Sequence, residues 1–492
     1  MAMISIENLS FGYDGSYENV FEDVSLRLDT SWRLGFTGRN GRGKTTFLRL
    51  LMGHYEYAGR IVSPVEFDYF PFETGDKTRT AAALLAPLLA ESEGWEIYRE
   101  LSLLALSDTV LDRPFETLSN GEQTKLLLSA LFSRENRFLL IDEPTNHLDM
   151  EARALVSDYL RSKSGFLLVS HDREFLDGCV DHILALNRAN IEVQRGDFSS
   201  WLRNKELADS FELAENERLK KDVKRLSAAA ARTAAWSDKV EKSKHQPLDS
   251  GLSPDRGHIG HKAAKLMKRA KGIETRQTAA ADAKSALLKN LDTAEPLFLR
   301  PLRHHAARLI ELRDVAISYG DRPVCEGLRF SLAAGERVAL HGRNGSGKTS
   351  LLKLLLGQDI PHSGTVFIAS GLRFSYVSQD TSRLCGNLRS FAEHSGLDES
   401  LFKAILRKLD FSRPQLERNM EDFSEGQKKK VLLAKSLCEE AHVYIWDEPL
   451  NYVDVLSRMQ IEVLIKQSSP TMLFVEHDRA FETSIATRVI DL

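Results

Sequence analysis

The chain has 492 residues, of which 42% are hydrophobic and 28% are charged, a soluble globular composition long enough for two or three domains. It holds no run of about eighteen apolar residues and opens without a secretory signal, so the sequence predicts no membrane span and a cytoplasmic protein. The four cysteines are widely spaced, which favours a reducing compartment and argues against a zinc site.

The first motif in chain order is a glycine-rich loop at residues 38–45, which follows an apolar strand at 34–37 and precedes a leucine-rich helix. In a G-x-x-x-x-G-K-T loop, backbone N–H groups surround phosphates, the lysine reaches the β- and γ-phosphates and the threonine ligates Mg²⁺. The loop therefore predicts a nucleotide site. Its candidate binding residues are Gly38, Asn40, Gly41, Gly43, Lys44, Thr45 and Thr46.

Further along, an apolar strand at 138–142 ends in two acids, Asp142 and Glu143. A buried strand of a parallel sheet delivers its terminal carboxylates to the edge where ligands bind. We expect Asp142 to hold Mg²⁺ through water and Glu143 to polarise the attacking water. Strands ending in acids are common in purely structural roles, but the position of this one after a phosphate loop favours a catalytic role.

Residues 203–290 predict two long helices joined by a polar break. Apolar residues recur at helical steps over 207–240 and again over 266–291, and the break at 245–257 contains two prolines and two glycines. Facing apolar stripes predict an antiparallel helical hairpin. Forty helical residues at about 1.5 Å each reach roughly 60 Å, longer than a compact domain is wide. We therefore expect the hairpin to project and touch a partner.

The charge of this segment indicates the partner. Residues 201–290 contain 20 Lys and Arg against 12 Asp and Glu, a net +8, whereas the whole chain is −4 and the remainder therefore −12. A solvated helix face would explain a charge run, but a basic projection on an acidic body favours a nucleic-acid probe. The candidate RNA-contacting residues are Trp236, Lys262, Lys265, Lys268, Arg269 and Lys271.

Beyond the hairpin the first pattern repeats. A second glycine-rich loop lies at 342–349 and a second acid-ended strand at 443–448. By the same reasoning Thr349 and Asp447 are candidate Mg²⁺ ligands and Glu448 a candidate catalytic group. The candidate nucleotide-binding residues of this copy are Gly342, Asn344, Gly345, Gly347, Lys348, Thr349 and Ser350.

Two more motifs complete each copy. Leu-Ser-Asn-Gly-Glu-Gln at 118–123 and Phe-Ser-Glu-Gly-Gln at 423–427 precede the acids, and strands ending in His171 and His477 follow them. This order, present twice, resembles the ATP-binding cassette. The resemblance implies an α/β fold with two ABC-type nucleotide-binding domains (P-loop NTPase) joined by a long antiparallel α-helical hairpin linker. The expected domains are 1–200 and 306–492, with the linker at 201–305.

The resemblance also implies that the two cassettes close head to tail, with each ATP between one phosphate loop and the other cassette's signature. Ser and Gly at a helix N-terminus present N–H donors to the γ-phosphate. One site would combine Lys44, Asp142, Glu143 and His171 with Ser424 and Gly426. The other would combine Lys348, Asp447, Glu448 and His477 with Ser119 and Gly121. Tyr13 and Tyr319 precede the loops and would either stack on adenine or pack in the core.

The copies differ in one motif. The second has Ser-Tyr-Val-Ser-Gln at 375–379, which resembles a cassette Q-loop whose glutamine, Gln379, contacts Mg²⁺. The first reads Asp-Tyr-Phe-Pro-Phe at 68–72, and Phe72 cannot ligate a metal. We therefore expect two inequivalent sites.

Two cassettes on one chain, separated by a helical hairpin, resemble the ABC-F class of translation factors. Stretches at 211–217, 235–237, 258–269 and 446–454 resemble its Lsa and Vga antibiotic-resistance branch. That resemblance implies an ATPase that binds the bacterial ribosome in its closed ATP state, directs the hairpin to the P-site tRNA and peptidyl-transferase centre, and leaves on hydrolysis. It also implies protection against lincosamides, streptogramin A compounds and pleuromutilins.

The expected partners are large-subunit rRNA and P-site tRNA, with no membrane subunits, no DNA and a monomer in solution. A housekeeping ABC-F translation factor is the main alternative. A transporter motor does not suit two cassettes split by a basic segment. In chromosome ATPases the coil usually interrupts a cassette, whereas both cassettes are intact here.

Overall fold

The computed structural model describes residues 2–13, 19–72, 74–89, 94–146, 148–187, 190–242, 297–320 and 322–492, with isolated positions between 261 and 276. The chain divides into two compact units. The first comprises Met1–Leu186, Ile191–Ser199 and Ala294–Leu492 and contains both cassettes; the second comprises Asn187–Asn190 and Ser200–Thr293. The predicted domain boundaries remain a prediction.

The first cassette is built on two sheets. An antiparallel sheet has the order β2 (Phe21–Asp29), β1 (Met3–Phe11), β4 (Ala58–Val62). The larger sheet has the order β5 (Glu66–Phe70), β6 (Arg137–Asp142), β7 (Phe166–Val169), β3 (Arg33–Thr37), β8 (His182–Leu186), β9 (Ile191–Arg195). Its strands are parallel except for the β8–β9 pair. The strand predicted at 138–142 is therefore an inner strand, which explains its unbroken apolar run.

The second cassette repeats this plan. Its antiparallel sheet has the order β11 (Arg322–Ala333), β10 (Arg308–Tyr319), β13 (His362–Ile368). Its parallel sheet has the order β14 (Phe374–Val377), β15 (Val443–Asp447), β16 (Met472–Val475), β12 (Arg337–His341), β17 (Arg488–Asp491). The repeat of strand order around β3 and β12 confirms the predicted duplication of a P-loop α/β fold.

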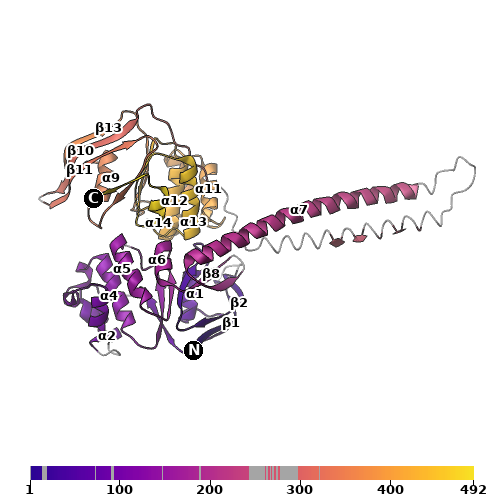
Figure 1. Ribbon diagram of the computed structural model, residues 1–492, viewed down its shortest axis with the longest axis horizontal. Helices are drawn as coiled ribbons and strands as arrows, with labels where there is room; N and C mark the ends of the chain where they lie inside the picture. The colour runs from indigo at the N-terminus through magenta and orange to yellow at the C-terminus, as the bar shows by residue number, and fades with distance from the viewer. Residues whose placement is uncertain are drawn as a thin grey trace, which may run out of the picture. The chain divides into compact units, whose positions relative to one another are not determined.

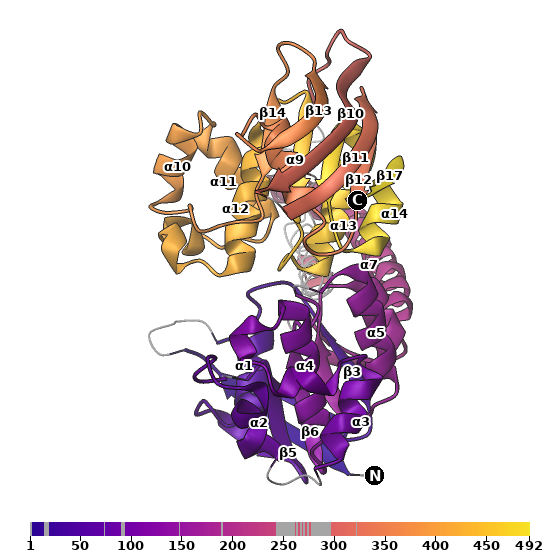
Figure 2. The ribbon, with the colours of Figure 1, turned by 90° about the vertical axis from the view of Figure 1, so that its left-hand side faces the viewer.

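Helices cover these sheets. In the first cassette they are α1 (Lys44–Leu51), α2 (Ala81–Leu89), α3 (Glu96–Leu103), α4 (Asn120–Phe132), α5 (Met150–Arg161) and α6 (Arg173–Cys179). In the second they are α9 (Lys348–Leu355), α10 (Leu388–His394), α11 (Glu399–Lys408), α12 (Glu425–Cys438), α13 (Val455–Ser468) and α14 (Arg479–Ile485). Figure 2 shows α10, α11 and α12 gathered on one side of the second cassette and β10, β11 and β13 on another.

Each cassette has an apolar core that holds its phosphate loop in place. In the first, Phe36 of β3 and Phe47 of α1 are fully buried and pack edge to face. In the second, Leu340 and Leu351 lie in the matching cluster, while a further cluster fills the space around α10–α12. Burying side chains of this size is worth about 1.5–3 kcal/mol each. The loops are therefore fixed at both ends by core residues.

The predicted first helix of the hairpin is α7 (Phe198–Lys242), drawn as one continuous helix in Figure 1. It begins nine residues before the apolar stripe that starts at Leu207, because Phe198 is buried and Ser199 is bonded by its N–H to Asp177 (2.8 Å). The second helix, predicted at 266–291, lies largely outside the described residues. The hairpin as a whole therefore stays a prediction.

Candidate active site

Both glycine-rich loops have the backbone shape that cradles phosphate. Gly43 and Gly347 directly precede α1 and α9 with φ of 101° and 95°, a left-handed conformation that favours glycine. A Cβ on Gly43 would lie 2.5 Å from Val20 Cγ1, and one on Gly347 2.8 Å from Val324 Cγ1. Any other residue would strain the turn and crowd the preceding strand. The loops thus depend on glycine for a physical reason.

The loop lysines are buried at the centre of these turns. Lys44 Nζ donates to the carbonyls of Gly38 (2.7 Å) and Arg39 (3.3 Å), and Lys348 Nζ to those of Gly342 (2.6 Å) and Arg343 (2.8 Å). Burial lowers the pKa of both ammonium groups. An ammonium group at the N-terminus of a helix that follows a glycine-rich loop is suited to binding polyphosphate.

The acids at the ends of β6 and β15 lie beside the loops. Asp142 Oδ2 accepts hydrogen bonds from Thr45 Oγ1 and from the Tyr69 hydroxyl, both at 3.0 Å. Asp447 is completely buried, and its carboxylate oxygens make no hydrogen bond of ordinary geometry to the described residues, although the Thr349 hydroxyl lies close enough to act on its pKa. Burial raises the pKa of Asp447 to about 6. A buried carboxylate with few donors fits a hard cation better than it fits apolar surroundings.

These residues fit Mg²⁺. Thr45 and Asp142 would hold it in one site, and Thr349, Gln379 and Asp447 in the other. Bound there, the cation would neutralise charge developing on the β- and γ-phosphates. Gln379 Nε2 donates to Glu448 Oε2 (2.8 Å), which connects the side where the metal would bind to the glutamate.

The second acid of each pair sits in a strained backbone conformation beside a histidine. Glu143 and Glu448 have φ of 53° and 47°, uncommon for residues with a Cβ and frequent at functional sites. His171 Nε2 is 3.3 Å from Glu143 Oε1, and His477 Nε2 is 3.5 Å from Glu448 Oε1. The structure therefore brings each predicted glutamate and histidine together.

The two glutamates have opposite electrostatics. Burial, reinforced by the neighbouring Asp142 carboxylate, raises the pKa of Glu143. Burial also acts to raise the pKa of Glu448, but His477 and Lys429 outweigh it and hold the pKa below its ordinary value. Glu448 is therefore the better ionised of the two, and the predicted inequivalence extends to the candidate catalytic bases.

The signature segments open helices. Ser119 caps α4 and Ser424 caps α12, each in a capping box with the residue three positions later. Gly121 and Gly426 lie in the first turns, where N–H groups point outward and favour an anion. Helices that begin at these serines explain why the signature pattern reads Ser-x-Gly.

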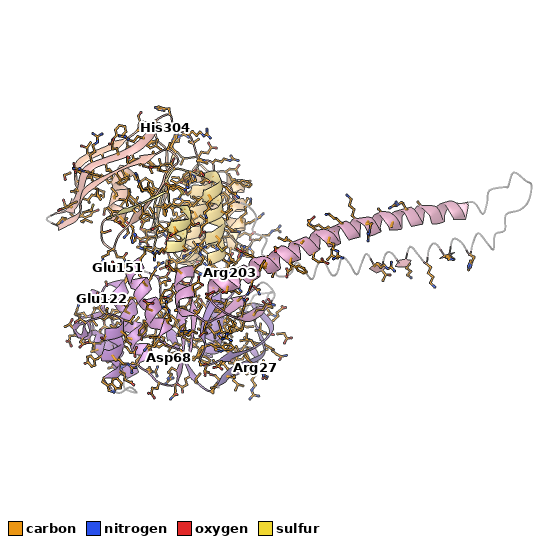
Figure 3. All side chains as sticks on the ribbon, in the orientation of Figure 1. Arg27, Asp68, Glu122, Glu151, Arg203 and His304 are labelled. Carbon is orange, nitrogen blue, oxygen red and sulfur yellow. The ribbon has the colours of Figure 1, made fainter. Side chains whose placement is uncertain are left out.

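The second composite site is a cavity of about 1050 Å³ between the two cassettes. The second cassette lines it with Lys348, Thr349, Gln379, Glu448 and His477. The first contributes its signature helix and the start of α5, including Ser119, Gly121 and the two glutamates labelled in Figure 3, Glu122 and Glu151. The remaining predicted residues on its wall are Asn344, Gly345, Gly347, Ser350 and Tyr319.

The first composite site is held more tightly. Asn40 Nδ2 donates to the carbonyl of Tyr452 in the other cassette (2.6 Å), and its Oδ1 is 3.0 Å from His171 Nε2. A Cβ on Gly426 would lie 2.6 Å from Tyr452 O and 3.4 Å from Asn40 Nδ2. The second signature therefore reaches the first phosphate loop. A Cβ on Gly41 would lie 3.9 Å from Gln415 Nε2 of the other cassette.

The two candidate adenine-stacking tyrosines are tied to the residue after each loop threonine. The Tyr13 hydroxyl is 2.7 Å from Thr46 Oγ1, and the Tyr319 hydroxyl donates to Ser350 Oγ (3.0 Å). Both rings are about half exposed, at 45% and 47%. Tyr13 also packs edge to face on Phe11, so both the stacking and the packing interpretations remain open.

Of the candidate RNA-contacting residues, Trp236 falls in α7, and Lys265, Lys268 and Lys271 are exposed. Lys262 and Arg269 lie outside the described residues. Sequence reasoning missed a second group on α7 in which basic residues outnumber acids, where Arg218, Lys221 and Arg225 line a hollow of about 490 Å³ together with Glu217. Its spacing of three and four residues was the available signal.

The model of the family described as "ABC transporter" matches residues 21–146 and 325–451, one match in each cassette. The chain belongs to this ABC family. Among the described residues, the search for a helix long and apolar enough to cross a membrane finds none.

Similar proteins indicate which branch of the ABC family the chain resembles. The chain is 29% identical to the ribosome protection protein VmlR of Bacillus subtilis, over 97% of this chain and 84% of that protein. It is 26% identical to the energy-dependent translational throttle protein EttA of Haemophilus influenzae, over 96% and 89%. These relatives confirm the ABC-F assignment made from the motifs.

Solved structures agree on the fold. The archaeal ribosome recycling factor aABCE1, in complex with the stalk protein aP1, matches with a TM-score of 0.65 at 18% identity, over 98% of this chain and 87% of that chain. The model of ribosome-bound archaeal Pelota and ABCE1 matches with a TM-score of 0.61 at 20% identity, over 98% and 76%. At these identities the likeness concerns the arrangement of two cassettes.

Proposed function

We propose that this ABC-F protein is a cytoplasmic ATPase that binds the bacterial ribosome in its ATP-bound, closed form and leaves after hydrolysis. The observation that carries the proposal is the composite cavity, in which Lys348, Glu448 and His477 of one cassette face Ser119 and Gly121 of the other. A site shared between two cassettes is complete only while they are closed. ATP bound there would therefore stabilise the closed form by mass action.

Hydrolysis at this site follows from the positions of its side chains. The loop and Lys348 would orient the phosphates, and the N-terminus of α4 would bind the γ-phosphate. The ionised Glu448 would orient water for in-line attack and accept its proton, and His477 would fix the glutamate and donate to the phosphate. The products would be ADP and phosphate.

The ribosome is the proposed partner because the positive charge of the linker segment and the names of the similar proteins both favour it. The linker segment carries a net +8 on an otherwise acidic chain, and α7 presents Arg218, Lys221 and Arg225 together. Basic groups arranged along a helix suit an RNA backbone. VmlR is named a ribosome protection protein and EttA a translational throttle. We extend this to contacts with large-subunit rRNA and P-site tRNA, made by a monomer without membrane subunits or DNA.

Protection against antibiotics is the finer part of the proposal. The segments that resemble Lsa and Vga proteins, together with similarity to VmlR, favour resistance to lincosamides, streptogramin A compounds and pleuromutilins. The loop from Trp236 to His261 would reshape RNA and tRNA near the peptidyl-transferase centre and so dislodge the drug. Similarity to EttA favours a second candidate, a translation factor without a role in resistance.

Growth of a drug-sensitive bacterium separates these candidates. Strains expressing the intact chain, a variant shortened between Lys242 and Gly257, and the Glu448→Gln variant are compared at equal protein level across the three drug classes. We expect only the intact chain to raise the inhibitory concentrations, while the shortened variant still hydrolyses ATP. No protection by the intact chain favours the translation-factor candidate, and protection by the shortened chain contradicts a role for the loop.

A further inference from the structure

A buried arginine outside all the predicted motifs joins the two candidate sites. Arg153 lies in the first turn of α5, four residues after the helix cap Asp149, and is only 9% exposed. Its Nε donates to the carbonyl of Leu148 (3.0 Å). Its Nη1 donates both to Asp172 Oδ2 (2.9 Å) and to the carbonyl of His477 in the other cassette (3.0 Å). One guanidinium therefore bonds to both cassettes.

Its partners are next to the chemistry of each site. Asp172 directly follows His171, which lies 3.3 Å from Glu143 in the first site. The carbonyl that Arg153 holds belongs to His477, whose ring lies 3.5 Å from Glu448 in the second site. A displacement of the segment containing His171 and Asp172 would therefore move the donor that fixes the backbone of His477.

The equivalent residue of the second cassette is bonded differently. Arg458 lies four residues after the cap Asp454 of α13 and donates to the carbonyls of Val453 (2.9 Å) and Leu450 (3.0 Å) and to Asp478 Oδ2 (2.8 Å). All these acceptors belong to its own cassette. Within the described part of the chain, Arg458 makes no hydrogen bond to the first cassette. Of these two equivalent arginines, Arg153 alone is hydrogen-bonded to described residues of both cassettes, while Arg458 acts on Asp172 and Glu143 of the first cassette only through its charge.

We propose that Arg153 is a positioning residue that carries the state of the first ATP site to the second by holding the backbone of His477. This inference rests on the proposed ATPase function. The planar guanidinium is suited to the role because it binds a carboxylate and a carbonyl at fixed angles, whereas a lysine ammonium is a flexible point charge. The bridge ends on the backbone of His477, so its loss should be read in turnover at the second site, which holds the Glu448–His477 pair.

The test isolates each site. Glu143→Gln leaves only the second site to hydrolyse ATP, and Glu448→Gln leaves only the first. We expect Arg153→Lys, added to Glu143→Gln, to lower kcat by about tenfold or more, because small displacements of catalytic groups have effects of this size. The KM for ATP should change by less than about twofold, since Arg153 holds a backbone beside the reacting groups rather than the nucleotide. The melting temperature should fall by only a few degrees, because Lys keeps the charge beside Asp172 although it cannot satisfy every acceptor of the guanidinium.

A second variant and a mirrored control keep the result interpretable. Asp172→Asn keeps the cap of α6 but removes the carboxylate that holds Arg153, so it should also lower second-site kcat. Arg458→Lys, added to Glu448→Gln, should change first-site kcat by less than about twofold. Unchanged second-site kcat in both Arg153→Lys and Asp172→Asn would overturn the proposal, and an equal fall in first-site kcat caused by Arg458→Lys would overturn the claim that the effect depends on the bridge between the cassettes. Wild-type chain without ATPase activity would instead refute the proposed function.

Discussion

Replacing Glu448 by Gln should abolish hydrolysis at the second site while leaving the fold nearly intact. The carboxylate accepts hydrogen bonds at Oε2 from Gln379 (2.8 Å) and Asn451 (2.7 Å), and Oε1 faces His477. A glutamine can place its carbonyl oxygen toward the two donors and its NH₂ toward the imidazole. The cost in stability should then be about 1 kcal/mol, that of one ordinary hydrogen bond.

The effect on rate should be much larger. Loss of a general base costs about 10²–10⁴-fold, which corresponds to roughly 2.7–5.4 kcal/mol in the barrier. The assay compares the rate of phosphate release by the Glu143→Gln variant with the rate of the Glu143→Gln/Glu448→Gln double variant. Thermal unfolding of both variants checks that the fold is intact. The control is Glu393→Gln, the same substitution at an exposed residue on α10. A double variant that retains more than about a tenth of the single variant's rate would refute the assignment of Glu448 as the base.

Three further results are expected. Tyr69→Phe removes a donor to Asp142 and should raise the Mg²⁺ concentration needed for first-site turnover by about 10–100-fold. Tyr376→Phe, at the equivalent position of the second cassette, should not change the Mg²⁺ concentration needed for second-site turnover. The triple variant Lys265→Glu/Lys268→Glu/Arg269→Glu should weaken ribosome binding and flatten its salt dependence, because fewer phosphate counterions are released; an unchanged slope in a pelleting titration would show a merely solvated face. Burial acts to raise the pKa of Glu100, but hydrogen bonds from Lys163, Tyr159 and Arg99 lower it below its ordinary value. Glu100→Gln should therefore destabilise the chain at pH 7, by thermal unfolding, and the difference should shrink as pH falls below about 4.5 and the wild-type carboxyl is protonated.

The sequence predicts motifs whose chemistry is local. A loop such as 38–45 needs glycine, lysine and threonine at fixed spacing, and a strand ending in Asp142 and Glu143 needs only an apolar run, so the order of residues alone reveals both. The duplication then predicts that both cassettes share one strand order, as is found around β3 and β12. The cassette resemblance also predicts which signature faces which loop, and the structure places them so.

Contacts that depend on tertiary packing could not be predicted from the sequence. Phe72 marks the missing Q-loop glutamine, but the sequence does not show that the Tyr69 hydroxyl reaches Asp142, because that bond depends on the register between β5 and β6. Arg153 carries no motif at all. Its proposed role depends on the hydrogen bond to the carbonyl of His477, a residue 324 positions away in the chain. Such bonds are set by the closure of two folded cassettes.

The measurement that tests the account most directly is ATP-dependent pelleting of the Glu143→Gln/Glu448→Gln variant with bacterial ribosomes. Both loops and both signatures are intact in this variant, so ATP should close the cassettes and remain unhydrolysed. We predict that it sediments with ribosomes in ATP, stays in the supernatant in ADP, and is retained longer than the wild-type chain. A variant that binds ATP but remains in the supernatant would contradict the claim that ATP closure drives ribosome binding.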